Sequence, residues 1–311
     1  MKIIYLMTAL FVLIGDVHGD TIFPIPDKPA YDTAKAKLGM RLFYEAGLSK
    51  DGTVACASCH QLPGNGADTL PYSRGVDNQE GDVNTPTVLN SRFLFVTMWD
   101  GRAKTLSDQV SLPITHPKEM ASSMKHAVRF LKSKPDYVRS FRALYRDGIT
   151  EETVTDAIVE FEKALDTPHS RYDRYLKGEN HILTPKELRG EKLFFGYGCI
   201  SCHNGIAIGG NMYQKIGIFL PYESNKNQFG RYTITGLEKD RYVFRVPSLR
   251  NVELTAPYMH DGKAKTLKEA VMLMGIHQLG VSLSNDELES IEAFLKTLTG
   301  ETPKILRRND L

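Results

Sequence analysis

The sequence is poor in cysteine, has a single tryptophan and shows no excess of charge of either sign. Its 311 residues include four cysteines, and 39 basic side chains nearly balance 37 acidic ones, for a formal net charge of +2. This balance argues against a nucleic-acid-binding surface. No stretch after residue 19 is long and apolar enough to cross a membrane. The length suits about two ordinary domains.

The longest apolar run lies at the N-terminus. Lys2 supplies a positive charge, residues 3–14 form an apolar stretch too short for a bilayer, and small residues lie near Gly19. We therefore predict a secretory signal peptide over residues 1–19, cleaved after Gly19. An uncleaved anchor is the alternative, because polar residues just before the cleavage point make it imperfect. The mature protein is expected to be soluble in an oxidising, exported compartment.

The four cysteines fall into two short motifs rather than a pattern typical of disulfides. Each motif reads Cys-x-x-Cys-His, over residues 56–60 and 199–203. This is the attachment signature of heme c, in which both thiols bond to the vinyl groups and the His binds iron. A zinc site is the alternative, but zinc does not require a His directly after the second Cys in both copies. The predicted heme-binding residues are Cys56, Cys59, His60, Cys199, Cys202 and His203.

The chain also carries a weak internal repeat. The segment DGRAKTL at residues 100–106 recurs as DGKAKTL at residues 261–267, an offset of 161 positions. Shorter matches precede each heme motif and each copy of the longer repeat, in the same order. We therefore predict one heme domain in each half, over residues 20–179 and residues 180–311.

Helix signals outnumber strand signals. Capping residues predict helices that begin after Thr150, Thr184 and Ser284, and the apolar spacing behind each cap fits one buried helix face. Residues 64–84 are polar and rich in glycine, which predicts a long loop over the first heme. The predicted fold is mostly α, with two cytochrome-c-like heme domains related by duplication.

The two hemes are expected to differ in their distal ligands. Met272 and Met274 follow the repeat in the second half, and a Met thioether is a common sixth ligand that raises the heme potential. The repeat offset places Ser111 and Pro113 at the matching positions of the first half, where neither supplies a thioether. Core packing is the alternative role for each methionine.

Polar side chains stand where the first half lacks that methionine. Gln109, His116 and Glu119 follow the first copy of the repeat. A carboxylate near an open iron could accept a proton from peroxide and return it to the leaving oxygen. Trp99 precedes the repeat at the position that His260 holds in the second half, which suggests an electron relay between the hemes. The alternatives are a solvated Glu119, a loop position for His116 and a core position for Trp99.

Together these motifs resemble the bacterial diheme cytochrome c peroxidases, whose superfamily includes the diheme enzyme that matures the quinone cofactor of methylamine dehydrogenase. The similarity covers nearly all of the mature chain and is densest over residues 84–87, 99–102, 113–120, 246–251, 255–258 and 274–280. It implies a peroxidatic, low-potential heme on His60 and a high-potential heme on His203 and Met274. Met274 is preferred to Met272 on this ground alone. A periplasmic location is also implied.

The resemblance implies further site residues. The family's catalytic glutamate, its nearby glutamine and the tryptophan between its hemes correspond here to Glu119, Gln109 and Trp99. One calcium ion is expected between the domains, bound largely by water, a ligand set that suits calcium. Its protein ligands would be the Asn84 side chain and the main-chain carbonyls of Thr255 and Pro257.

One position departs from the family. Its well-known members place a His in the glycine-rich loop after the first motif, where it caps the first iron in the oxidised resting state. Here no His lies between His60 and His116, and Val76 stands about where that His belongs. We therefore predict a first heme that is open and high-spin as isolated, or one ligated by another group such as His116.

The expected reaction is reduction of hydrogen peroxide to water, with electrons from a small cytochrome c or a cupredoxin. Peroxide-dependent oxidation of a partner protein's side chains is a second hypothesis, although the quinone-maturing enzyme has a Tyr where Met274 stands. A non-catalytic diheme electron carrier is a third, and the unequal ligand sets argue against it. No nucleic-acid partner is expected, and a homodimer would be in keeping with the family.

Overall fold

The computed structural model of the protein describes residues 21–224, 226 and 228–307. The predicted signal peptide, residues 1–19, lies outside the described residues. Within them, no helix is long and apolar enough to cross a membrane. The fold is mostly helical, as predicted, with one small antiparallel pair of strands, β1 (Tyr213–Lys215) and β2 (Val243–Arg245). The helices are α1 (Thr33–Phe43), α2 (Cys56–Cys59), α3 (Leu106–Thr115), α4 (Met124–Lys132), α5 (Pro135–Leu144), α6 (Glu151–Lys163), α7 (Arg171–Leu176), α8 (Pro185–Gly196), α9 (Tyr232–Thr235), α10 (Leu267–Met274) and α11 (Asn285–Lys296).

The three helix starts predicted from capping residues are confirmed. Thr150, Thr184 and Ser284 are the N-caps of α6, α8 and α11, and each side chain accepts a hydrogen bond from a backbone N–H three residues on. At the last two, the side chains of Glu187 and Glu287 accept from the N–H of the cap itself. This reciprocal pair of bonds satisfies two backbone donors that have no partner within the helix.

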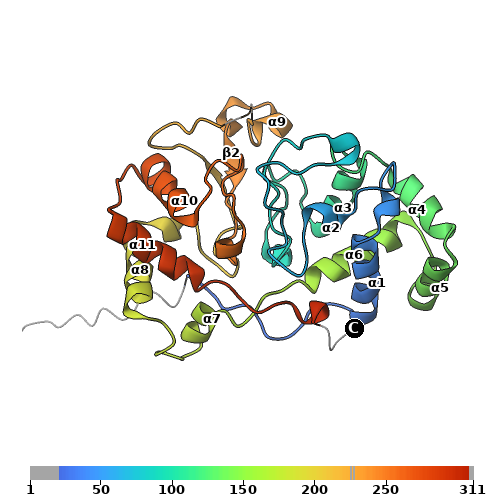
Figure 1. The fold of residues 1–311 in the computed structure, drawn as a ribbon, viewed down its shortest axis with the longest axis horizontal. Coiled ribbons are helices and arrows are strands. Elements are labelled where there is room, and N and C mark those ends of the chain that lie inside the picture. Colours follow the sequence, from blue (N-terminus) through green and yellow to red (C-terminus); the bar gives the residue numbers. More distant parts are fainter. Residues whose placement is uncertain (1–20, 225, 227, 308–311) are drawn as a thin grey trace, which may run out of the picture.

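Figure 1 shows two lobes lying side by side. Helices α1 and α3–α6 form one lobe, and α8, α10 and α11 form the other. In the first lobe α1 packs on α6, where the rings of Phe43 and Phe161 lie 5.1 Å apart. In the second lobe α8 packs on α11, where the rings of Phe194 and Phe294 lie 5.3 Å apart. Each lobe therefore has its own apolar core built on one helix pair.

A glycine lies at the crossing point of each helix pair. A Cβ on Gly39 of α1 would lie 1.8 Å from the carbonyl oxygen of Ala157, and a Cβ on Gly190 of α8 would lie 1.9 Å from that of Ser290. Any side chain would force the helices apart, so only glycine allows this approach. These two glycines belong to the short matches that precede the heme motifs in the sequence.

The loops after the heme motifs correspond in the same way. An isolated antiparallel bridge joins Thr97 to Ala103, and another joins Tyr258 to Ala264. Both residues of the second bridge stand 161 positions after those of the first, the same offset as the sequence repeat. The repeat therefore marks segments with the same local backbone pairing.

A buried network centred on Thr167 joins the two lobes. The side-chain amides of Asn90 and Asn251 both donate to Thr167 Oγ1, over 2.7 and 2.8 Å. Asn90 Oδ1 accepts from the Thr167 N–H over 2.9 Å. The two asparagines are also 161 positions apart, and both have left-handed backbones, with φ of 60° and 58°. Asparagine tolerates this conformation better than most residues, so the connection between α6 and α7 is held to both lobes.

The chain crosses between the lobes at several places. Ile22 packs in the core of the second lobe, whereas Ile305 packs with the first. Figure 1 shows both terminal segments passing beneath the lobes. Helix α7 also belongs to the second lobe by packing, because the ring of Tyr172 meets that of Phe294 at 5.0 Å. By packing, the change of lobe falls between α6 and α7, earlier than the boundary expected at residue 180.

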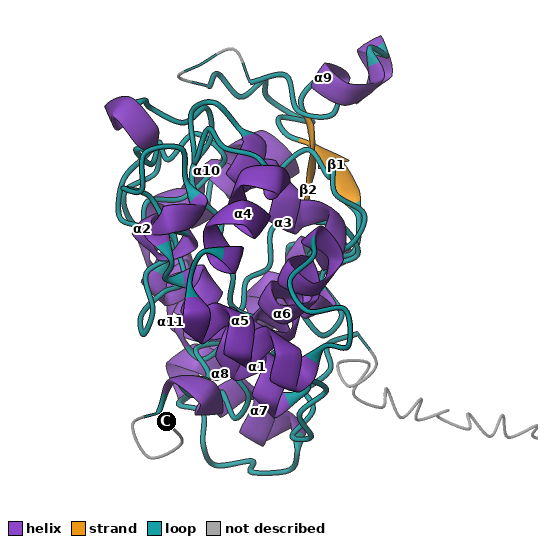
Figure 2. Cartoon of the chain, turned by 90° about the vertical axis from the view of Figure 1, so that its right-hand side faces the viewer, coloured by secondary structure: helices purple, strands orange, loops and turns teal. Residues whose placement is uncertain are grey.

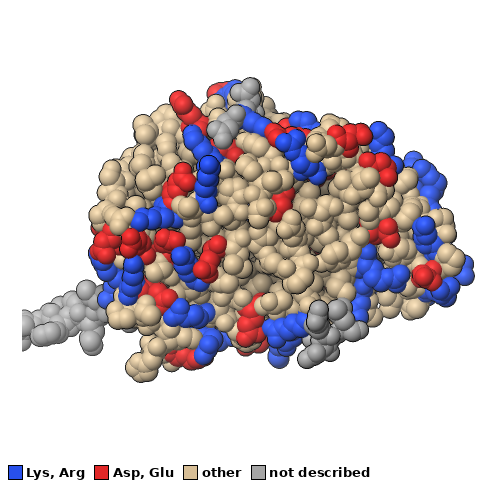
Figure 3. Space-filling view, in the orientation of Figure 1, with Lys and Arg blue, Asp and Glu red and all other residues tan. Residues whose placement is uncertain are grey.

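Helix α9 lies at one end of the molecule, with the small sheet below it and beside the upper helices (Figure 2). On the face drawn in Figure 3, basic and acidic side chains are interspersed, with uncharged surface between them. Several of these charges pair at the surface, such as Lys186 with Glu289 at 3.0 Å. Exposed pairs of this kind contribute little stability, so the fold depends mainly on the two cores.

Candidate heme sites

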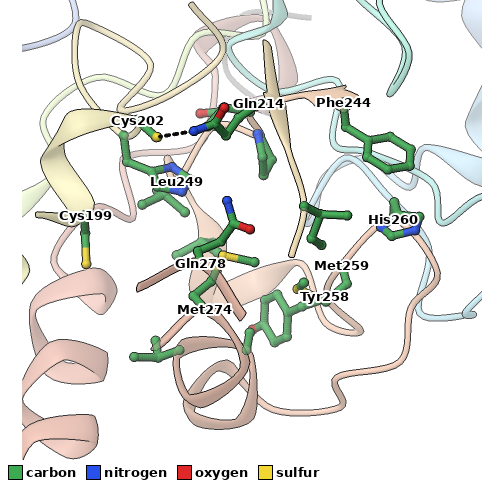
Figure 4. A pocket seen from close by; sticks show the side chains of 18 of the residues that line it. Cys199, Cys202, Gln214, Phe244, Leu249, Tyr258, Met259, His260, Met274 and Gln278 are labelled. Carbon is green, nitrogen blue, oxygen red and sulfur yellow. Dashed lines mark hydrogen bonds between the residues drawn. The ribbon is translucent and has the colours of Figure 1, made fainter. Parts of the chain in front are cut away.

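A cavity of about 540 Å³ lies in the second lobe and reaches the boundary with the first. Both cysteines of the second motif, His203 and Met274 line it. Figure 4 shows Cys199 and Cys202 on one side, with Met274 and Gln278 projecting toward the middle. Its volume and largely apolar wall are typical of a cofactor site.

The donor atoms in this cavity fit a covalently bound heme. Burial lowers the pKa of His203 to about 4, although the carbonyls of Ile208 and Pro247 oppose this shift. The imidazole is therefore neutral, which is the form that binds iron. The two thiols form no disulfide, and burial raises the pKa of Cys199 to about 11. Two unoxidised thiols and a neutral imidazole around an apolar cavity match the attachment chemistry of heme c.

The structure separates the two methionines that follow the repeat. Met274 ends α10 and lines the cavity, whereas Met272 is 39% exposed on the outer face of the helix. One turn of π-helix, Gly275–Leu279, follows Met274 directly. Gln278 in this turn accepts hydrogen bonds from Gly217 N and Ile218 N and donates to the Lys215 carbonyl. These bonds fix the end of α10, and such π-turns are frequent at functional sites.

The first lobe contains a smaller cavity around the first motif. The residues that line it include the three heme-binding residues and both predicted catalytic polar residues: Cys56, Cys59, His60, Gln109 and Glu119. His60 Nδ1 lies 3.0 Å from the Gly66 carbonyl oxygen. A carbonyl partner makes Nδ1 the donor and leaves the lone pair of Nε2 for a metal. Burial also lowers the pKa of His60 and raises that of Cys56 to about 12, so this donor set fits heme c as well.

Glu119 lies in the turn after α3 with its carboxylate at the cavity wall. Burial raises the pKa of Glu119, and the positive charges of His116 and Arg102 oppose this shift. His116 Nδ1 lies 3.5 Å from Glu119 Oε1, too far for a strong hydrogen bond. Gln109 Oε1 is buried and makes no hydrogen bond to the described residues. The cavity thus contains a carboxyl group able to exchange protons and an amide oxygen without a partner, while His116 stands beside Glu119.

The glycine-rich loop after the first motif packs directly on the Glu119 turn. The Val76 N–H donates to the Glu119 carbonyl over 2.9 Å, and Val76 is 1% exposed. A Cβ on Gly75 would lie 2.1 Å from the Lys118 carbonyl oxygen and 2.5 Å from that of Glu119. The position expected for a ligating His is therefore held by a buried valine, whose backbone supports the predicted catalytic glutamate.

A third polar residue of this cavity was not predicted from the sequence. Glu162 on α6 is 5% exposed, lines the cavity with Cys56, and its Oε2 makes no hydrogen bond to the described residues. Burial raises the pKa of Glu162 to about 8. Its position four residues after Ile158, on the apolar face of α6, was the available signal. Residues four positions apart lie on the same helix face, so a glutamate at this position is expected to be buried with Ile158.

Trp99 lies where the two lobes meet. Its indole N–H donates to the Asn84 carbonyl over 2.7 Å, and its ring lies 6.2 Å from that of His260, edge to face. Asn84 also makes a hydrogen bond across the boundary, in which its backbone N–H donates to the His260 carbonyl over 2.9 Å. Trp99 and Asn84 line the larger cavity together with Thr255 and Pro257. The structure thus brings the predicted relay residue and the predicted calcium ligands to one wall.

Asn84 presents its amide oxygen as the available acceptor, because its Nδ2 donates to the carbonyls of Leu70 and Pro71 over 3.1 and 3.4 Å. Among the described residues, no group of three or more His, Cys, Asp or Glu side chains could hold a metal. That finding does not bear on a site made of an amide oxygen, main-chain carbonyls and water.

Comparison with known proteins supplies the context for these cavities. Residues 33–181 match the family model described as di-haem cytochrome c peroxidase. The chain is 46% identical over 297 residues to cytochrome c551 peroxidase of Nitrosomonas europaea, covering 95% of this chain and 89% of the relative. It is 39% identical over 275 residues to cytochrome c551 peroxidase of Pseudomonas aeruginosa, covering 86% and 80%.

The fold also matches solved structures. A MauG-like protein associated with microbial copper homeostasis aligns with a TM-score of 0.80 and 29% sequence identity, covering 92% of this chain and 95% of that one. The similarity therefore extends over both lobes and both cavities.

Proposed function

This chain belongs to the di-haem cytochrome c peroxidase family of enzymes, and we propose that it reduces hydrogen peroxide to water in the first lobe with electrons that enter through the second. The observation that carries this proposal is the difference between the two cavities. The first combines a heme-binding motif with Glu119 and Gln109, whereas the second combines such a motif with Met274. The two lobes, with their matching glycine crossings and bridges, are best explained as products of one duplication.

The proposed chemistry needs proton transfer by residues of the first cavity. When bound, the heme groups supply the iron that coordinates peroxide and the redox centres that carry the electrons. Glu119 accepts a proton from the peroxide and returns it to the departing oxygen, which then leaves as water. Gln109, with its unpartnered Oε1, accepts a hydrogen bond from the same substrate. Two electrons and two protons convert one peroxide into two waters.

The second cavity is proposed to accept electrons one at a time. Cys199 and Cys202 would hold the heme, and His203 and Met274 would supply a nitrogen and a sulfur ligand to its iron. A His/Met ligand pair favours a high reduction potential. Trp99 is held between the lobes by its bond to Asn84, and we propose that it forms part of the path by which electrons reach the first lobe.

Several finer assignments belong to the same proposal. The donor is a small cytochrome c or a cupredoxin, the location is periplasmic, and the assembly is a homodimer. A calcium ion bound by Asn84, Thr255 and Pro257 would bridge the lobes. Because the Val76 side chain has no ligand atom, an iron held by His60 would receive no ligand from this loop in the protein as isolated. The oxidised spectrum should then contain a high-spin component, whereas two low-spin six-coordinate hemes would contradict an open site.

Replacement of Glu119 by Gln tests the proposed reaction. The E119Q variant should keep both hemes and lose most of its peroxidase turnover with a reduced small cytochrome c, because general acid–base groups contribute about 100- to 10,000-fold. The matched control is E151Q, since Glu151 is exposed at the start of α6. Turnover of E119Q at the wild-type rate, with both hemes present, would show that the assigned role is wrong.

A further inference from the structure

Two arginines of the second lobe are almost completely buried, and they differ in their partners. Arg250 is 1% exposed and pairs with Asp173 at 2.6 Å, and neither side chain of this pair is exposed. Arg245, on β2, is 3% exposed. Among the described residues, no carboxylate lies within ion-pair distance of Arg245. A buried cation without a counter-charge is costly, so this difference between the two arginines requires an explanation.

The hydrogen bonds of the Arg245 side chain to the described residues go to neutral groups. Its Nε donates to the Met98 carbonyl over 3.3 Å and its Nη1 donates to the Val246 carbonyl over 3.2 Å. Burial lowers the pKa of Arg245 to about 10, and the neighbouring Tyr213 opposes this shift. Arg245 lines the 540 Å³ cavity that contains the second heme motif. The guanidinium therefore keeps donor capacity in a cavity whose protein wall gives it no anion.

His260 lines the same cavity as Arg245, and its Nε2 has no hydrogen-bond partner among the described residues. Its ring stacks on that of Phe244, with centroids 4.3 Å apart, and it lines the same cavity. It is 2% exposed, and its Nε2 is buried without a hydrogen bond to the described residues. Both residues also contact Trp99. The backbone N–H of Arg245 donates to the Trp99 carbonyl over 2.8 Å, and the His260 ring meets the Trp99 ring edge to face. A guanidinium without a counter-charge and an imidazole nitrogen without a hydrogen bond to the described residues thus line the cavity where it reaches the boundary between the lobes.

We infer that Arg245, with His260 beside it, binds a propionate carboxylate of the second heme. The heme held by Cys199 and Cys202 brings carboxylates into this cavity, and Arg is the side chain best suited to bind a carboxylate in a buried site. The bond supplies the missing counter-charge and anchors the edge of the heme beside Trp99. This assignment requires a heme in the second site and does not depend on which lobe reduces peroxide.

The inference predicts a change in the second heme's midpoint potential. Loss of the guanidinium leaves the propionate charge uncompensated, which favours the oxidised iron, so R245Q should lower that potential and leave the first heme's nearly unchanged. R245K keeps a positive charge and should fall between R245Q and wild type. H260N should shift the potential in the same direction as R245Q, by less. The control is R231Q, because Arg231 is half-buried beside the same sheet, where it donates to the Asp100 carbonyl.

The measurement is a spectroelectrochemical titration of the purified holoprotein, with heme content determined for each variant. A lower second-heme potential in R245Q, absent in R231Q, supports the assignment. An unchanged second-heme potential in R245Q with both hemes present overturns it, and so does an equal shift of both hemes. If R245Q does not fold, the second-heme potentials of R245K and H260N test the assignment instead. Wild-type potentials in both of these variants overturn it. A wild-type potential that varies with phosphate concentration at constant ionic strength also overturns it, because a free anion would then occupy the site.

Discussion

Replacement of Glu162 by Gln should make the protein more resistant to unfolding at alkaline pH. The Glu162 carboxyl is 5% exposed beside Cys56, and its pKa is raised from 4.5 to about 8 because burial penalises the charged form. The unfolded chain therefore loses this proton at a much lower pH than the folded protein does. Between these two pKa values the folded state holds one more proton, so a rise in pH favours unfolding. Glutamine has nearly the same shape and no proton to lose.

The size of the effect follows from the pKa difference. Each pKa unit corresponds to about 1.4 kcal/mol, so a carboxyl whose pKa is raised from 4.5 to about 8 in the folded protein loses on the order of 5 kcal/mol of stability across this range. The gain in the free energy of unfolding from E162Q should be smallest near pH 4.5, increase with pH and level off above about pH 8. Urea unfolding of the holoprotein, followed by circular dichroism from pH 5 to pH 8.5, measures this difference between E162Q and wild type.

A matched control separates this effect from a general effect of removing acidic groups. Glu151 begins the same helix and is exposed, so E151Q should shift stability by less than about 1 kcal/mol at every pH. A gain from E162Q that is constant across the pH range would refute the assignment of a buried, protonated carboxyl. A loss that grows with pH would also refute it, because it would mean that the ionised form is stabilised by the fold.

Two further predictions concern positions that the structure separates from close neighbours. M274A should lower the second heme's midpoint potential and alter its oxidised spectrum. M272A, on the exposed face of the same helix, should leave both the potential and the spectrum unchanged. Equal effects from the two variants would contradict Met274 as the ligand. G75A should reduce peroxidase turnover at least tenfold with both hemes retained, because its Cβ would meet the Lys118 and Glu119 carbonyls and displace the glutamate. The control is G196A at the end of α8, where an added Cβ meets nothing within 4 Å. Wild-type turnover in G75A would show that the loop does not position Glu119.

Much of the fold could be predicted because its signals are local. The caps at Thr150, Thr184 and Ser284 depend on residues three positions apart, and each begins the expected helix. The repeat offset aligned segments that do share the same backbone bridges, and the short matches before the heme motifs contain the two glycines of the helix crossings. The offset also pointed to Met272 and Met274, and only the rotation of α10 shows which of them faces the cavity.

The remaining features depend on contacts between distant segments. No local pattern places Ile22 in the second core or Ile305 with the first, and α7 joins the second lobe through the contact of Tyr172 with Phe294. The same holds for the unpaired state of Arg245. Only the packed structure shows that Asp173 lies beside Arg250 and not beside Arg245.

The measurement that tests the central claim most directly is the stoichiometry of peroxide-dependent oxidation of a reduced small cytochrome c. The holoprotein, with both hemes present, is mixed with excess reduced cytochrome and a limiting amount of hydrogen peroxide. Reduction of peroxide to water requires about two molecules of a one-electron donor for each peroxide, at a rate proportional to enzyme concentration. Failure of the holoprotein to oxidise the cytochrome, or consumption of peroxide with no oxidation of the donor, would contradict the proposed peroxidase function.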